Sequence, residues 1–169
     1  MTIGLLLAGG NSSRFEYGDK ALYQNFAERC FKTLSDLTAP VYISAKLSNL
    51  TALQTRFPQA ELLLDEPPYV AEGPLSALYA LSTRVNSPID VLILSVDNPE
   101  VAAKSLQQLL DKPNRYADHY FTIAHLTFEA ADLTTFLATG QRRIKKFLNF
   151  LDAQAIALPA DELIDHNRK

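Results

Sequence analysis

A chain of 169 residues has the length of one domain and is long enough to bury a substantial core. Its formal net charge of −3 argues against a general nucleic-acid binder, whose surface would be basic. No apolar run approaches the ~20 residues of a membrane span, and no cationic segment precedes the first apolar run, so we expect neither a membrane anchor nor a signal peptide. The single cysteine, Cys30, suits the reducing cytoplasm, where we expect the protein.

Short apolar runs and amphipathic stretches alternate along the chain. The apolar runs predict strands at 3–8, 41–44, 62–64 and 89–94. Apolar residues at helical spacing predict helices at 20–37, 48–57, 74–85 and 100–111. Beyond residue 118 the alternation weakens, and we expect a strand at 120–126, helices near 129–139 and 141–151, and a strand near 154–158. This order predicts an α/β fold, in which helices cover both faces of a mostly parallel sheet.

The segment after the first strand has the composition of a polyphosphate site. It runs Leu7-Ala8-Gly9-Gly10-Asn11-Ser12-Ser13-Arg14 and is followed by Asp19-Lys20. Glycines let backbone N–H groups approach phosphate oxygens and tolerate a positive φ, while Arg14 offers a forked donor and Lys20 a compact charge. The spacing fits neither a Walker A loop nor the dinucleotide fingerprint G-x-G-x-x-G. A plain strand-to-helix turn with two surface cations is the alternative.

The Gly-rich segment and two aspartates are expected at one edge of the sheet. Gly9-Gly10 follow the first strand, Asp65 follows the third and Asp97 follows the fourth. Ligands of open α/β sheets bind outside the carboxyl ends of the strands, so the sequence predicts one site there. Asp65 could also be a turn former ahead of two prolines. The Gly73-Pro74 turn opens a helix whose free N–H groups suit an anion or a ribose hydroxyl, although a plain helix start explains it nearly as well.

Asp97 is the candidate ligand for Mg²⁺. Proteins hold this ion through one or two carboxylates, and phosphate oxygens complete its shell. We expect the second ligand from the end of the chain, with Asn167 as the candidate and Asp165 in reserve. The alternative is that Asp97 caps the next helix, with Pro99 in its first turn.

Three segments in order resemble the motifs of molybdenum cofactor guanylyltransferases. The run LAGGNSSRFEYGDKAL resembles their signature, roughly LAGG-x-S-x-R-M-G-x-x-K. Leu64-Asp65 with the later EGPL at 72–75 resembles their Asp and Gly-Pro-Leu turn, and LSVDNP at 94–99 resembles their metal-binding Asp before a Pro. Residues 122–124 and 140–143 resemble, more weakly, their acceptor-side half.

The resemblance implies a fold, a reaction and partners. The fold would be Rossmann-like, of the nucleotide-diphospho-sugar transferase type, as one domain over 1–169, with a nucleotide-binding half at about 1–117 and an acceptor-side half at 118–169. The reaction would transfer GMP from GTP to molybdopterin, with Mg²⁺ as the cofactor, and other molybdenum cofactor biosynthesis proteins would be partners. A related transferase using CTP or a sugar 1-phosphate is the alternative.

The resemblance also implies residue roles. Arg14, Lys20 and Asp97 would act on the phosphates, and Asp65 would hold the nucleotide near the base or ribose. A phosphorylated acceptor needs cations away from the triphosphate, and Arg142 and Arg143 belong to the one basic cluster, which also contains two lysines. A solvated helix face explains that cluster equally simply. His119 is a weaker acceptor-site candidate, and we expect His125 in the core.

Four departures from the family pattern stand out. Phe15 and Glu16 occupy the usual Met and Gly positions, and Ala77 replaces a Gly. Glu16 would place a carboxylate near the phosphates, so we expect it to weaken nucleotide binding. The closing Asn-x-Asn-Thr-Pro is replaced by Asp-His-Asn-Arg at 165–168. These departures motivate a further alternative, a nucleotide-binding protein or structural subunit without turnover.

Overall fold

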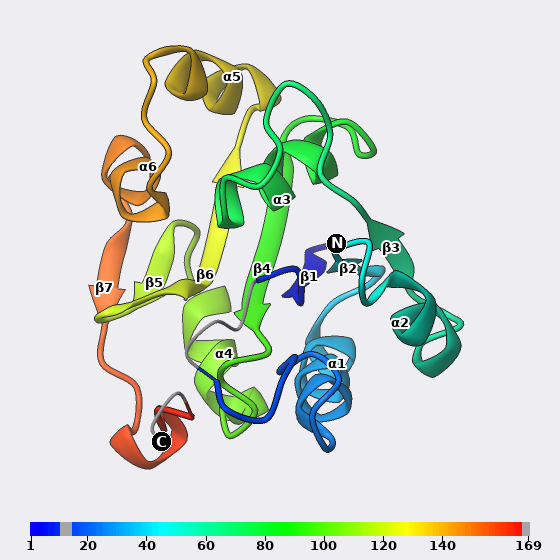
Figure 1. Cartoon of the computed structure of the whole chain (residues 1–169). Helices are drawn as coiled ribbons and strands as arrows, with labels where there is room; N and C mark the ends of the chain where they lie inside the picture. Colours follow the sequence, from blue (N-terminus) through cyan, green and yellow to red (C-terminus); the bar gives the residue numbers. More distant parts are fainter. Residues whose placement is uncertain (11–14, 167–169) are drawn as a thin grey trace.

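The computed structural model describes residues 1–10 and 15–166, and its strands form one seven-stranded sheet of order β3-β2-β1-β4-β6-β5-β7 (Figure 1). The strands are β1 (Ile3–Leu7), β2 (Val41–Ser44), β3 (Glu61–Leu63), β4 (Ile89–Ser95), β5 (Arg115–Ala117), β6 (Tyr120–Phe128) and β7 (Gln154–Ile156). Parallel pairs join β3, β2, β1 and β4, while β6 is antiparallel to both β4 and β5. The mostly parallel α/β sheet predicted from the sequence is therefore confirmed.

Helices cover both faces of the sheet. One face carries α1 (Phe26–Leu37), α2 (Leu50–Arg56) and α4 (Ala103–Leu110), and the other carries α3 (Pro74–Ser82), α5 (Ala130–Ala138) and α6 (Ile144–Phe150). Leu6 of β1 packs into the first cluster and its neighbour Leu5 into the second, because successive strand side chains point to opposite faces. A 3₁₀ turn, Ala160–Glu162, follows β7 near the end of the chain.

Three predicted helices begin at least three residues later than expected, and the one predicted near 141–151 begins at Ile144. The helix predicted at 20–37 begins at Phe26, because residues 20–25 form turns and Gln24 has a φ of 45°, which no right-handed helix accommodates. The helix predicted at 100–111 begins at Ala103, and its N-cap is Ala102. Asp97 therefore does not cap a helix, and that alternative was wrong.

The sequence did not predict β5 or the reversed direction of β6. Asp118 and His119 connect β5 directly to β6, and His119 has a positive φ of 66°. A connection of two residues can only join antiparallel neighbours. β5 escaped notice because its three residues, Arg115–Ala117, carry no apolar run. His125 lies in β6 and is buried, as expected.

Cys30 occupies a fully buried position in α1. Burial raises the pKa of its thiol to about 12, so it stays protonated at neutral pH. None of the helices within 1–10 and 15–166 combines the length and hydropathy that crossing a bilayer requires.

Candidate active site

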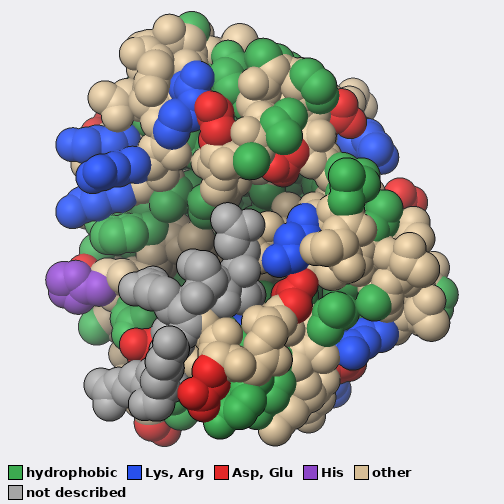
Figure 2. Space-filling view, viewed as in Figure 1, with side chains coloured by type: hydrophobic (Ala, Val, Ile, Leu, Met, Phe, Trp, Pro, Cys, Tyr) green, Lys and Arg blue, Asp and Glu red, His purple; other side chains and the backbone are tan. Residues whose placement is uncertain are grey.

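The main cleft of the described chain opens at the carboxyl ends of β1 to β4. Its volume is about 660 Å³, and Figure 2 shows a hollow in the middle of the molecular face. Nine of the predicted nucleotide-binding residues line it, together with residues that the sequence analysis did not single out. The predicted ones are Leu7, Ala8, Gly9, Gly10, Lys20, Asp65, Gly73, Pro74 and Asp97, of which Asp97 is also the predicted metal ligand.

Lys20 and Asp97 form an ion pair in this cleft. Lys20 Nζ lies 2.9 Å from Asp97 Oδ1, although 77 positions separate the two residues. The Lys20 side chain is 3% exposed, whereas that of Asp97 is 52% exposed. A lysine buried this deeply needs a charged partner, because desolvation penalises an unpaired ammonium. The pair brings one fixed cation and one accessible carboxylate to the ends of β1 and β4.

Close packing favours glycine at position 9. A Cβ at Gly9 would lie 3.3 Å from the backbone carbon and oxygen of Ala45, tighter than ordinary contact. The described glycines with a positive φ are Gly18, Gly73 and Gly140, so close approach rather than backbone conformation is the reason for glycine at position 9. Asn11, Ser12, Ser13 and Arg14 lie outside the described residues, so their predicted roles stay predictions.

Asp65 and Gly73 shape the loop that precedes α3. Asp65 Oδ2 accepts the N–H of Ala71 at 2.8 Å, and Ala71 has a positive φ of 58°. Gly73 is the N-cap of α3 with a φ of 75°, a conformation that favours glycine, and Pro74 begins the helix. Asp65 therefore supports the loop as well as lining the cleft.

Lys46 lines the cleft and is the most important residue there that the sequence analysis missed. Its Nζ donates to the carbonyl oxygen of Gly10 at 2.8 Å and lies 3.4 Å from Asp19 Oδ2. Leu47 and Val70 also line the cleft and are largely exposed. Lys46 lies just past the carboxyl end of β2, so the strand-edge argument used for Asp65 and Asp97 could have found it.

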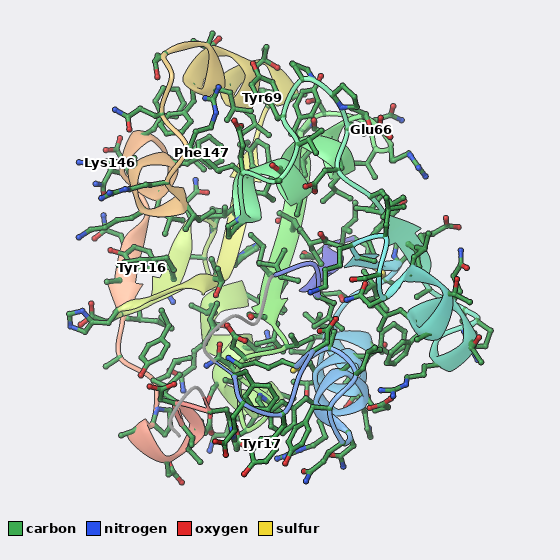
Figure 3. The ribbon with its side chains drawn as sticks, in the orientation of Figure 1. Tyr17, Glu66, Tyr69, Tyr116, Lys146 and Phe147 are labelled. Atoms are coloured by element: carbon green, nitrogen blue, oxygen red, sulfur yellow. The ribbon has the colours of Figure 1, made fainter. Side chains whose placement is uncertain are left out.

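Of the three departures at Phe15, Glu16 and Ala77, Ala77 alone lines the cleft. Phe15 is buried and packs edge-on against Tyr17 and Tyr23. Glu16 is exposed and is not a cleft-lining residue; its carboxylate hydrogen bonds with Tyr17 and raises the pKa of that phenol. Tyr17 lies at the outer edge of the molecule (Figure 3). Ala77 lines the cleft and is buried.

Arg142 is engaged with the loop before α3. Its Nε lies 2.6 Å from Glu72 Oε2, its guanidinium stacks 5.1 Å from the Tyr69 ring centroid, and an Nη donates to the Leu137 carbonyl oxygen at 2.7 Å. Arg143 precedes α6 and is exposed. Neither arginine lines the main cleft. Their acceptor-binding roles stay predictions.

The rest of the basic cluster faces outward. Lys145 and Lys146 are exposed on α6, and Figure 2 shows Lys and Arg side chains gathered on this side. Lys146 lies on the outer side of the helix (Figure 3). His119 is also exposed, in the turn between β5 and β6.

The described end of the chain packs against α1 and against the segment before α4. His166 Nε2 lies 2.9 Å from Glu100 Oε2, and its ring centroid lies 4.6 Å from that of Phe26. Asp165 is exposed, and Asn167 lies outside the described residues. Among residues 1–10 and 15–166 no three His, Cys, Asp or Glu side chains gather into a metal cluster. Asp97, a hard and half-exposed oxygen donor, fits the mode in which Mg²⁺ takes few protein ligands and several phosphate or water oxygens.

A family model for the MobA-like NTP transferase domain matches residues 4–154. The chain belongs to this family. Membership of this MobA-like family supports nucleotidyltransferase activity, as the sequence resemblance predicted.

Solved structures share the fold of this MobA-like domain. A protein from Aquifex aeolicus VF5 matches with a TM-score of 0.73 and 23% identity, over 100% of this chain and 95% of that one. A nucleotidyl transferase from Methanothermobacter matches with a TM-score of 0.71 and 16% identity, over 99% of this chain and 92% of that one. Molybdopterin-guanine dinucleotide biosynthesis protein A from Archaeoglobus fulgidus matches with a TM-score of 0.65 and 16% identity, over 96% of this chain and 85% of that one. A fourth structure, 4-diphosphocytidyl-2C-methyl-D-erythritol synthase, has a TM-score of 0.62 and 11% identity, over 96% and 91%.

Proposed function

We propose that this protein transfers GMP from GTP to molybdopterin and releases pyrophosphate. The observation that carries the proposal is the Lys20–Asp97 pair, which lies beside the Gly9-Gly10 turn in a cleft at the carboxyl ends of β1 and β4. Family membership supports nucleotidyl transfer, and the sequence resemblance to guanylyltransferases supports the choice of base and acceptor. We place the activity in the cytoplasm, where a buried thiol such as Cys30 remains reduced.

The reaction needs positioning more than acid–base chemistry. An oxygen of the acceptor's terminal phosphate forms a bond to the α-phosphorus of GTP. The bond from the α-phosphorus to the bridging oxygen breaks, and pyrophosphate leaves with that electron pair. A monoester phosphate has a second pKa of about 6 and is mostly ionised at neutral pH, so no strong general base is required. The protein supplies orientation and charge stabilisation.

Each cleft residue has a place in this proposal. Lys20 offsets the negative charge that develops on the leaving pyrophosphate, and Arg14 is proposed for the same role from the family resemblance. Asp97 would hold Mg²⁺, which neutralises phosphate oxygens when bound. Lys46 adds a cation on the β2 side of the cleft, between the Gly-rich turn and exposed Leu47.

Pyrophosphate release tests the proposal. Purified protein is incubated with Mg²⁺, molybdopterin and one of GTP, ATP, CTP or UTP. We expect release with GTP, dependent on both molybdopterin and Mg²⁺. Release with CTP alone favours the related transferase, while calorimetric binding without release favours a nucleotide-binding protein that has lost turnover. Absence of both binding and release overturns the proposal.

A further inference from the structure

A fully buried asparagine, Asn49, hydrogen bonds to residues that line the cleft. Asn49 has no exposed surface and is not a cleft-lining residue. Its Nδ2 donates to the carbonyl oxygen of Ala8 at 2.9 Å and to Asp19 Oδ2 at 3.0 Å, and its Oδ1 accepts the N–H of Lys46 at 2.9 Å. One side-chain amide thus joins three segments: the end of β1, the loop before Lys20 and the connection from β2 to α2.

Asp19 passes this restraint to its neighbour Lys20. Asp19 Oδ1 accepts the N–H of Ala21 at 2.9 Å, while Oδ2 receives Asn49. The Asp19 carboxylate therefore connects Asn49 to the N–H of Ala21, the residue that follows Lys20. Residues 15–25 belong to no helix or strand, so these side-chain bonds add to the turn bonds that Leu22 and Tyr23 make with the carbonyl oxygens of Asp19 and Lys20.

We propose that Asn49, acting through Asp19, is a positioning residue that sets the placement of Lys20 relative to the Gly-rich turn for triphosphate binding. The inference rests on the proposed nucleotidyl transfer. Asparagine suits the position because one amide supplies two donors and two acceptor lone pairs. An apolar residue would leave the Ala8 carbonyl, Asp19 and the Lys46 N–H without their buried partner, which is costly. A displacement of about 1 Å at a reacting site can cost about 100-fold in rate.

A pair exchange between positions 19 and 49 tests the coupling. Asn49→Asp removes both donors and sets a second carboxylate against Asp19, and we expect GTP·Mg²⁺ affinity by calorimetry to fall about 10- to 100-fold. Adding Asp19→Asn restores the parental net charge and lets the new amide donate to the new carboxylate. The double variant is expected to recover a large part of the loss.

The matched control is Asn114→Asp. Asn114 Oδ1 accepts the N–H of Thr127 at 3.0 Å, away from the cleft, and the substitution adds the same charge while keeping an acceptor. We expect its GTP affinity to stay within about two-fold of the parent. An equal loss in this control would show a general charge or stability effect and overturn the proposal.

Hydrogen exchange separates this inference from the proposed function. In Asn49→Ala, we expect faster exchange at the amides of Ala21 and Leu22, which Asp19 holds, while β4 stays protected. If the parent neither binds nor turns over GTP, the transfer proposal fails, and exchange alone decides the positioning role. Unchanged exchange at Ala21 overturns it. With an active parent, unchanged KM and kcat in both Asn49 variants also overturns it, even if the melting temperature falls.

Discussion

At the scale of single residues, the Lys20–Asp97 pair combines burial with access. Lys20 is enclosed while half of the Asp97 side chain faces solvent. Burying an ammonium is costly, so a protein that only needed a stable fold would gain little from this arrangement. In the proposed function, an incoming phosphate shares Lys20 with Asp97, whose exposed half is open to an ion or water.

Replacing Lys20 is expected to weaken nucleotide binding more than it alters folding. Lys20→Met keeps much of the buried stem and removes the charge, so GTP·Mg²⁺ affinity should fall by about 1.5–3 kcal/mol, the usual worth of a hydrogen bond to a charged group. Calorimetry measures this loss. Lys104→Met, at an exposed position of α4, is the control and should bind as the parent does. Parental affinity in Lys20→Met would refute the role.

Asp97→Asn separates charge from shape at the same pair. The amide preserves the side-chain size and still accepts a hydrogen bond from Lys20, and no helix depends on it as a cap. We expect the melting temperature to fall, because buried Lys20 loses its charged partner, and Mg²⁺-dependent pyrophosphate release to fall by at least about ten-fold, roughly 1.4 kcal/mol. Thermal unfolding and release assays on the same preparation check this. Persistence of Mg²⁺-stimulated release would mean that another group holds the ion.

At the scale of elements, Arg142 links the segment before α6 to the loop before α3. Arg142 comes from the segment before α6, and its partners Glu72 and Tyr69 belong to the loop before α3. That loop continues into Gly73 and Pro74, which line the cleft. Arg142 therefore stabilises one wall of the cleft from the predicted acceptor-side half, without lining the cleft itself.

A double-mutant cycle measures this link. Arg142→Lys loses the guanidinium fork that bonds Glu72 and the Leu137 carbonyl together, so we expect a loss of about 1 kcal/mol in the free energy of unfolding. Combined with Glu72→Gln, the two losses should be non-additive by about 0.5 kcal/mol or more. Arg143→Lys, at the exposed neighbouring position, should change stability by less than about 0.5 kcal/mol. Additive losses would remove the argument for coupling.

At the scale of the whole molecule, the two ends of the strands differ in what they carry. The carboxyl edge carries the cleft, while the amino end of β4 carries a bonded cluster around Asp90. Asp90 accepts from Thr2 at 2.7 Å and Thr127 at 3.0 Å, and His125 Nε2 lies 2.6 Å from it. His125 Nδ1 lies 3.1 Å from the carbonyl oxygen of Leu109 near the end of α4. The cluster ties β1, β4, β6 and α4 together.

This cluster predicts an acid-sensitive part of the stability. Burial alone would raise the pKa of Asp90, but hydrogen bonds from Thr2, His125 and Thr127 outweigh it and hold the pKa below its ordinary value. A lowered folded-state pKa contributes stability that is present above the unfolded pKa of about 3.9 and is lost as pH falls through the folded value. Urea unfolding between pH 6 and pH 3 should show this loss, and Asp90→Asn should flatten it. GTP affinity should not change in Asp90→Asn, and a matching loss of affinity would contradict the separation of the two edges.

The sequence by itself determined the strand ends and what stands on them. Gly9, Asp65 and Asp97 follow short apolar runs typical of buried strands, and parallel strands bring their carboxyl ends to one edge. Local composition and connection length settle such features, because a strand needs only its own apolar residues to be recognised. The same rule was available for Lys46, which was missed only because it was not applied to the second strand.

Only the tertiary structure decided which distant residues meet. The pairing of Lys20 with Asp97, the burial of Asn49 behind the Gly-rich turn and the engagement of Arg142 by Glu72 each join segments far apart in the chain. The late start of α1 at Phe26 belongs here too, because turns and the bonds made by Asp19 outweigh a helical apolar spacing that is already present from residue 20. These outcomes depend on desolvation and hydrogen-bond geometry between elements, and residue spacing along one element carries no information about either.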